Sequence, residues 1–203
     1  MKLAVHLASA SPRRRELLAH LGVPFDIVVS DVDEATIDQS AGAEAYVRTA
    51  AEAKALDVAL RHDGLALGVD TDVVDPDGRI LGKPANPEEA ATMLRSLAGR
   101  THTVLSGVAL MESRSGEVLR RDSRLVRTFV TFAPLDESAV AAYVATPEPY
   151  DKAGGYGMQG RAMAFVARID GDPSNVIGLP LWTVAEMLAE FGVRTWPVGS
   201  LQS

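Results

Sequence analysis

The chain has 203 residues, of which 47% are hydrophobic and 23% charged, an ordinary globular composition with enough apolar residues for a substantial core. This length predicts one α/β domain over residues 1–203, built as two lobes around a cleft. The net charge of -7 disfavours sequence-independent nucleic-acid binding, because a phosphate backbone requires a basic surface. The absence of cysteine excludes disulfides and thiolate metal sites and is consistent with the reducing cytoplasm.

The N-terminal segment predicts a strand, a turn and the start of a helix. Residues 3–7 are apolar, but the run is too short for a signal peptide or a membrane span, so we expect a cytoplasmic protein without a membrane partner. Ser11 is the expected helix N-cap, Pro12 occupies the first helical position, and Gly22 ends the helix.

Three consecutive arginines, Arg13, Arg14 and Arg15, fall in the first turn of this helix. Positive charge there opposes the helix dipole, at a cost of a few tenths to about 1 kcal/mol for each residue. Backbone N–H groups and guanidinium donors at a helix N-terminus suit phosphate oxygens. Solvated arginines paired with Glu16 explain the segment equally well, so the segment alone leaves both interpretations open.

The next elements alternate between strands and helices. We expect a strand at 25–29, an acidic loop at 31–34, an alanine-rich helix at 43–61, a strand at 65–69, and a hairpin of 73–75 with 79–81. Carboxylates therefore follow two neighbouring strands, and such oxygen ligands hold Mg²⁺ or Mn²⁺. Solvated loop acids are the alternative, which we prefer for Asp75 and Asp77 beside the hairpin turn.

The second half predicts long strands and further helices. We expect a helix from Asn86 to about 99, strands at 101–111 and 118–132, a helix at 136–146, a Pro- and Gly-rich loop at 147–160, a strand at 165–169, and a helix at 181–191. Together these elements predict an α/β fold with a mixed, twisted and elongated sheet flanked by helices.

Several polar residues outside the arginine segment are candidates for ligand binding. Lys54, taken alone, is best interpreted as a solvent-facing lysine of its helix. Lys83 between Gly82 and Pro84 is held by a turn, so it could bind phosphate, although a surface role is slightly favoured for it in isolation. The Gly-rich loop that carries Gln159 offers an amide suited to reading a base edge, with a merely flexible loop as the alternative.

The four histidines show no metal-ligand spacing, and no serine lies in a Gly-x-Ser-x-Gly segment. These absences give little support to a zinc enzyme or a serine hydrolase.

Taken together, collinear motifs over nearly the whole chain resemble the Maf family of nucleoside triphosphate pyrophosphatases. The motifs are Ser9-Ala10-Ser11-Pro12-Arg13-Arg14, Val32-Asp33-Glu34, Lys54, Asp70-Thr71, Gly82-Lys83-Pro84, the loop 151–160 and the segment 175–181. The resemblance implies a fold similar to that of inosine triphosphate pyrophosphatase. It also implies metal-dependent hydrolysis of a nucleoside triphosphate to a monophosphate and pyrophosphate.

The resemblance also implies residue roles. Asp70 would activate water and, with Glu34, hold Mg²⁺ or Mn²⁺. Lys54 and Lys83 would act with Asp70 in catalysis, and together with Arg13 they would bind and neutralise the triphosphate. Residues expected to bind the substrate are Ser9, Ser11, Arg13, Arg14, Thr71, Gln159 and Asn175, of which Arg13, Thr71 and Gln159 occupy positions tied to substrate choice. This arrangement agrees with phosphoryl chemistry, which depends on positioning and charge neutralisation.

The loop at 152–160 resembles the branch of the family that acts on dTTP and UTP, so we expect these or modified pyrimidine nucleotides as substrates. Asp72 replaces an apolar residue of the family pattern, and Ala133 replaces a frequent arginine. Asp72 could add a metal ligand or raise the pKa of Asp70 by like-charge repulsion.

Two other functions remain alternatives. The first is a nucleotidyltransferase, although the glycine-rich first loop expected of that class is missing from this sequence. The second is a regulator of septum formation, which would bind a nucleotide tightly without hydrolysing it. A homodimer is plausible.

Overall fold

The computed structural model describes residues 3–195. These residues form a mixed sheet with helices packed on it. The helices are α1 (Pro12–Ala19), α2 (Ala43–Arg61), α3 (Pro87–Leu97), α4 (Glu137–Val144), α5 (Pro173–Ile177) and α6 (Leu181–Glu190). The strands are β1 (Val5–Leu7), β2 (Phe25–Ile27), β3 (Gly64–Val74), β4 (Ile80–Leu81), β5 (Thr101–Arg114), β6 (Glu117–Phe132) and β7 (Val166–Asp170). Short 3-10 helices are η1 (Glu34–Thr36), η2 (Glu148–Asp151), η3 (Ala153–Gly155) and η4 (Arg161–Phe165).

The sheet contains seven strands in the order β2-β1-β3-β5-β6-β7, with β4 paired to β3. β1 is parallel to both neighbours, since Val5 lies opposite Phe25 of β2 and Leu65 of β3. β4 and β7 pair in the antiparallel sense with β3 and β6. The predicted α/β fold with a mixed sheet is therefore confirmed.

The chain divides into two compact units. The first comprises the residues through Asp70, Ser106–Val126 and those from Gly178 onward, and the second comprises Thr71–Leu105 and Arg127–Ile177. β3, β5 and β6 contribute residues to both units. The single domain expected over 1–203 remains a prediction, and residues 1–2 and 196–203 lie outside the described part of the chain.

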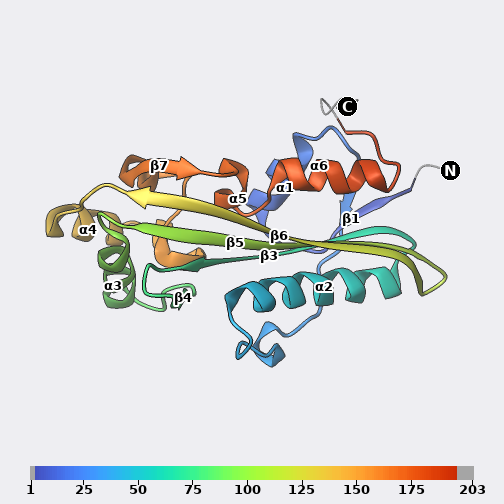
Figure 1. Cartoon of the computed structure of the whole chain (residues 1–203), viewed down its shortest axis with the longest axis horizontal. Coiled ribbons are helices and arrows are strands. Elements are labelled where there is room, and N and C mark those ends of the chain that lie inside the picture. The colour runs from blue at the N-terminus through green and yellow to red at the C-terminus, as the bar shows by residue number, and fades with distance from the viewer. Residues whose placement is uncertain (1–2, 196–203) are drawn as a thin grey trace. The chain divides into compact units, whose positions relative to one another are not determined.

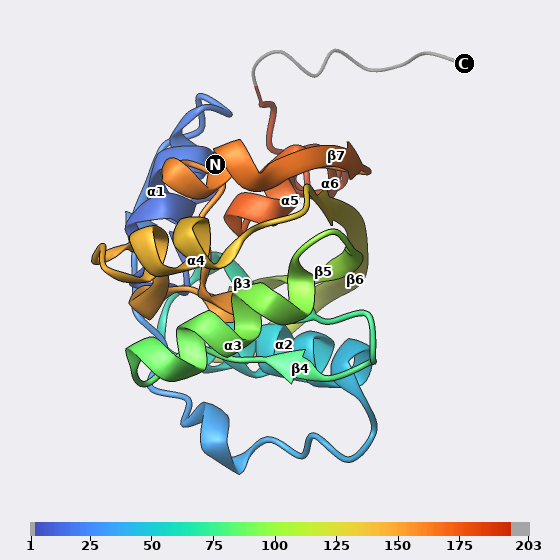
Figure 2. The ribbon, with the colours of Figure 1, turned by 90° about the vertical axis from the view of Figure 1, so that its left-hand side faces the viewer.

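In the first unit, α2 lies on one face of the strands, whereas α1 and α6 lie on the other (Figure 1; Figure 2). Glycines let α2 approach these strands closely. A Cβ atom at Gly68 of β3 would lie 2.1 Å from the carbonyl oxygen of Ala51, and one at Gly107 of β5 would lie 2.1 Å from that of Val47. Alanines of α2 complete this contact, because Ala51, Ala55 and Ala59 are fully buried.

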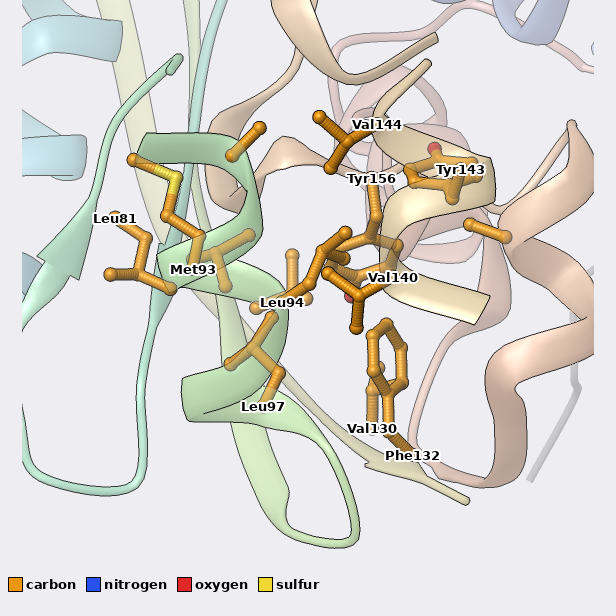
Figure 3. Close-up of a cluster of buried hydrophobic side chains, with 14 residues drawn as sticks. Leu81, Met93, Leu94, Leu97, Val130, Phe132, Val140, Tyr143, Val144 and Tyr156 are labelled. Atoms are coloured by element: carbon orange, nitrogen blue, oxygen red, sulfur yellow. The ribbon is translucent and has the colours of Figure 1, made fainter. Parts of the chain in front are cut away.

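The second unit has its own hydrophobic core, formed by α3, α4 and the strands next to them. Figure 3 shows Leu94 and Leu97 of α3 turned toward Val140 of α4 and toward Phe132 of β6. Tyr156, from the loop after η3, enters the same core. The Gly-rich loop is therefore anchored by an aromatic side chain.

Most predicted elements are present, and the differences have physical causes. The strand expected at 65–69 and the hairpin arm at 73–75 form one strand, β3, because the polar residues between them continue in extended conformation. Four 3-10 helices and the short α5 were not predicted, since each contains too few residues for a periodic pattern. No helix within residues 3–195 is long and apolar enough to cross a membrane.

His102 is buried in the second core and has an unusual protonation equilibrium. Its side chain lies edge-on to Phe132 at 5.0 Å between ring centroids, and only 1% of the residue is exposed. Burial lowers the pKa of His102 to about 4. The imidazole is therefore neutral in the folded protein at neutral pH.

This shift predicts a pH-dependent stability. Between pH 6.5 and 4 the unfolded chain binds a proton at His102 that the folded protein excludes, so the free energy of unfolding falls as the pH falls through this window. The loss should reach about 3 kcal/mol by pH 4. Urea denaturation of the wild type and of His102→Gln at several pH values measures it, and equal pH dependence in the two proteins would contradict the assignment.

Candidate active site

The arginine segment begins α1 as the sequence predicts, with Ser11 as N-cap and Pro12 in the first turn. The hydroxyl of Ser9 accepts hydrogen bonds from the backbone N–H of Ser11 at 3.2 Å and from a terminal nitrogen of Arg14 at 3.3 Å. The backbone N–H of Arg14 points to the Ser11 hydroxyl at 3.5 Å. Ser9, Ser11 and Arg14 therefore form one connected group at the start of the helix.

Arg14 is held by a backbone carbonyl far along the chain. Its Nε atom donates to the backbone carbonyl of Gly178 at 2.9 Å, and Gly178 has a φ of +121°, a conformation that favours glycine. Burial lowers the pKa of the Arg14 guanidinium, the negative charges of Asp70 and Glu34 raise it, and the positive charge of Arg13 lowers it. The arginine segment and the two carboxylates thus lie within electrostatic range of one another.

Lys54 lies between these two carboxylates. Its Nζ atom is 2.6 Å from Glu34 Oε1 and 2.7 Å from Asp70 Oδ1. Lys54 and Asp70 are each 7% exposed, whereas the Glu34 side chain is half-exposed. The interpretation of Lys54 as a solvent-facing lysine is wrong, because the close packing of α2 on β3 directs its side chain to Asp70.

The carboxylates Glu34 and Asp70 suit a divalent cation as oxygen donors. Each places an oxygen within 2.7 Å of the same ammonium group, so both oxygens lie close together. No group of three or more His, Cys, Asp or Glu side chains in residues 3–195 could hold a metal. Mg²⁺ in proteins is commonly bound by one or two carboxylates and completes its coordination with water and substrate phosphates, so Glu34 and Asp70 could hold it through lone pairs that Lys54 does not use.

Lys83 and Gln159 are exposed residues of the second unit, and a backbone hydrogen bond connects the two segments that carry them. The N–H of Gly154, in the Gly-rich loop, donates to the carbonyl oxygen of Gly82 at 3.1 Å. The N–H of Gly160 donates to the carbonyl oxygen of Gly157, which closes a turn around Gln159. The loop therefore makes specific backbone contacts, and the role of Gln159 in reading a base stays a prediction.

Thr71 and Asn175 also belong to the second unit. Thr71 is half-buried and directly follows Asp70 on β3. Asn175 is fully buried, and its side-chain nitrogen donates to the carbonyl of Val104 and to the hydroxyl of Thr128, both at 3.1 Å. These bonds brace the core, so a role of Asn175 in substrate binding stays a prediction.

Two features of the structure were not apparent from the residues alone. Asp75, expected to be solvated, is buried and accepts hydrogen bonds from the N–H groups of Asp77 and Arg79 and from Arg79 Nε. Gly178 lies in the motif at 175–181, but nothing in the spacing of that motif indicated that Gly178 binds Arg14. A glycine followed by Leu179-Pro180 is the only local signal, since it suggests a special backbone conformation.

Comparisons with known proteins agree with this fold. A family model described as "Maf-like protein" matches residues 4–191. The chain is 53% identical over 191 residues to a protein named dTTP/UTP pyrophosphatase from Moorella thermoacetica, covering 94% of this chain and 96% of that protein. A protein of the same name from Symbiobacterium thermophilum is 49% identical over 198 residues, covering 96% and 97%. The solved structure of a HAM1 protein from Coxiella burnetii shares the fold, with a TM-score of 0.52, 18% sequence identity and coverage of 93% and 99%.

Arg14→Lys should destabilise the protein. A lysine ammonium cannot reproduce the planar fork that reaches both Gly178 and Ser9, and losing one charged hydrogen bond costs about 1.5–3 kcal/mol. Urea denaturation measures this loss. Arg15→Lys, at an exposed position of the same helix, is the matched control and should remain near the wild type. Equal stability of both variants would show that the Arg14 contacts contribute nothing.

Proposed function

Because this chain belongs to the Maf-like protein family, we propose that it hydrolyses nucleoside triphosphates to nucleoside monophosphates and pyrophosphate. Two relatives named dTTP/UTP pyrophosphatase, each matched over more than nine-tenths of both chains, support dTTP and UTP as substrates. The observation that carries the proposal is Lys54 bound between Glu34 and Asp70, within range of the arginines of α1.

The charges of this group suit a polyphosphate. Arg13, Arg14 and Lys54 carry three positive charges within electrostatic range of the carboxylates Glu34 and Asp70, and these cations can offset part of the negative charge of a bound polyphosphate. Guanidinium groups donate two parallel hydrogen bonds to phosphate oxygens, and the ammonium of Lys54 acts as a point charge. Lys83 would add a further positive charge to the triphosphate in this proposal.

Asp70 is proposed as the base. Lys54 binds its Oδ1 atom, and a carboxylate accepts through both oxygens, so the other oxygen can take a proton from water. The water oxygen then forms a bond to phosphorus, the bond to the leaving pyrophosphate breaks, and the proton passes to Asp70. Lys54 fixes the direction of the carboxylate during this step.

A divalent cation is part of the proposal, held by Glu34 and Asp70. Mg²⁺ or Mn²⁺ bound there would neutralise charge on the substrate phosphates. Thr71, Gln159 and Arg13 are proposed to contribute to substrate choice, with Ser9, Ser11, Arg14 and Asn175 in substrate binding. We also propose that the protein is located in the cytoplasm and forms a homodimer.

A panel of dTTP, UTP, CTP, ATP and GTP tests the activity. With Mg²⁺ or Mn²⁺ we expect equal amounts of pyrophosphate and monophosphate, fastest from dTTP and UTP, and little product after chelation with EDTA. Stepwise release of orthophosphate would contradict the reaction, and tight binding without turnover would instead support a regulator. Activity that EDTA leaves unchanged would remove the cation, and formation of a nucleotidyl adduct would indicate a transferase.

Asp70→Asn should lower kcat about 10²- to 10⁴-fold, because an amide cannot act as a general base. Its carbonyl oxygen can still accept the hydrogen bond of Lys54, so circular dichroism should show a folded protein. Asp77→Asn is the matched control, since Asp77 forms a half-exposed ion pair with Arg100 and should leave kcat unchanged. Full activity of Asp70→Asn would exclude Asp70 as the base.

A further inference from the structure

His102 and Tyr156 form a buried hydrogen-bonded pair to which the proposed reaction gives no role. The Nε2 atom of His102, on β5, lies 2.7 Å from the hydroxyl oxygen of Tyr156, in the Gly-rich loop. Tyr156 is 5% exposed, and its ring packs edge-on against Phe132 at 4.8 Å between centroids. The loop therefore has one side chain fixed both by packing and by a hydrogen bond.

Side chains on both sides of Tyr156 also hold the loop, since Lys152 Nζ donates to the carbonyl of Glu148 at 2.8 Å and the Glu148 carboxylate accepts from the N–H of Arg161 at 3.0 Å. The segment between them is rich in glycine. Gly154 and Gly155 adopt left-handed backbone conformations, with φ values of +72° and +68°. At Gly154 a Cβ atom would lie 3.0 Å from the side chain of Val73, so the glycine permits a close approach. Glycines alone gain no packing energy from a fixed position, so the order of the loop depends on anchors such as Tyr156.

The contacts of the loop connect this anchor to the segments that carry Lys83 and Gln159. Tyr156 precedes Gln159 by three residues, and the N–H of Gly157 donates to the hydroxyl of Tyr143 at 3.3 Å. The N–H of Gly154 reaches the carbonyl of Gly82, next to Lys83. Movement of Tyr156 would therefore displace the backbone on both sides of it.

We propose that His102 and Tyr156 are positioning residues that hold the Gly-rich loop so that Gln159 selects the base of the nucleotide. This inference rests on the proposed function, because it requires Gln159 to contact the base. His102 acts through Tyr156, and neither side chain touches the substrate. The neutral imidazole suits this role, since burial keeps its pKa at about 4 and no charge enters the core at neutral pH.

Tyr156→Phe removes the hydroxyl and keeps the packed ring. We expect the ratio of kcat/KM for UTP to kcat/KM for GTP to fall about three- to tenfold, which is the contribution of one hydrogen bond. The change should occur in KM, with kcat for UTP close to the wild type. Tyr150→Phe is the matched control, since it removes a hydroxyl that bonds to the Val144 carbonyl earlier in the same segment, and it should leave the ratio unchanged.

Variants of His102 test whether the hydrogen bond is responsible. His102→Leu should lower the ratio as Tyr156→Phe does, whereas His102→Gln, with a polar atom near the Nε2 position, should restore most of it. The double variant His102→Leu, Tyr156→Phe should be no worse than either single variant. Additive losses would show that the two residues act separately and would overturn the proposal.

Amide hydrogen exchange separates failure of this proposal from failure of the proposed function. In Tyr156→Phe the amides of Gly157 and Gly160 should exchange faster, while that of Ala98, which bonds to the Leu94 carbonyl at the end of α3, should not change. Unchanged exchange at Gly157 and Gly160 would overturn the proposal even if no triphosphate is hydrolysed. If Gln159→Ala removes base selection and Tyr156→Phe does not, the positioning role is wrong although the proposed function stands.

Discussion

The close contact between α2 and β3 is the constraint on which the rest of the first unit depends. Gly68 and the alanines of α2 let the helix lie against the strand, and Lys54 consequently reaches Asp70, two residues along β3 from that glycine. A buried ammonium is costly unless negative partners are close, and Glu34 and Asp70 provide them. Small residues with no chemistry of their own thus bring Lys54 to the Asp70 carboxylate.

Positive side chains gather in this region, although the molecule as a whole is negatively charged. The chain as a whole carries a net charge of -7, yet Arg13, Arg14 and Lys54 lie within electrostatic range of Glu34 and Asp70 in one region. Such a group of positive charges attracts polyanions, while the acidic remainder of the surface repels long ones such as nucleic acids. A short polyphosphate is therefore better suited to this protein than an extended one.

Local rules predicted the fold well wherever one segment carries its own signal. Ser11 with Pro12 marks the start of α1, and Asn86 with Pro87 marks that of α3, because capping chemistry involves adjacent residues only. The burial of Lys54 and of Asp75 was not predictable from spacing, since it depends on partners brought close by packing. Of the named candidates, the structure brings Glu34, Lys54 and Asp70 together, but the motifs did not indicate that Arg14 is bound to Gly178.

The bond between Arg14 and Gly178 joins residues 164 positions apart in the chain. Protein synthesis proceeds from the N-terminus, so the arginine segment is made early. Its hydrogen bond to Gly178 can form only after almost the whole chain has been synthesised. A nascent chain or an N-terminal fragment lacks this support and leaves the guanidinium of Arg14 without its carbonyl acceptor. The contacts of the arginine segment, although it is encoded near the start of the chain, are consequently complete only when Gly178 has been made.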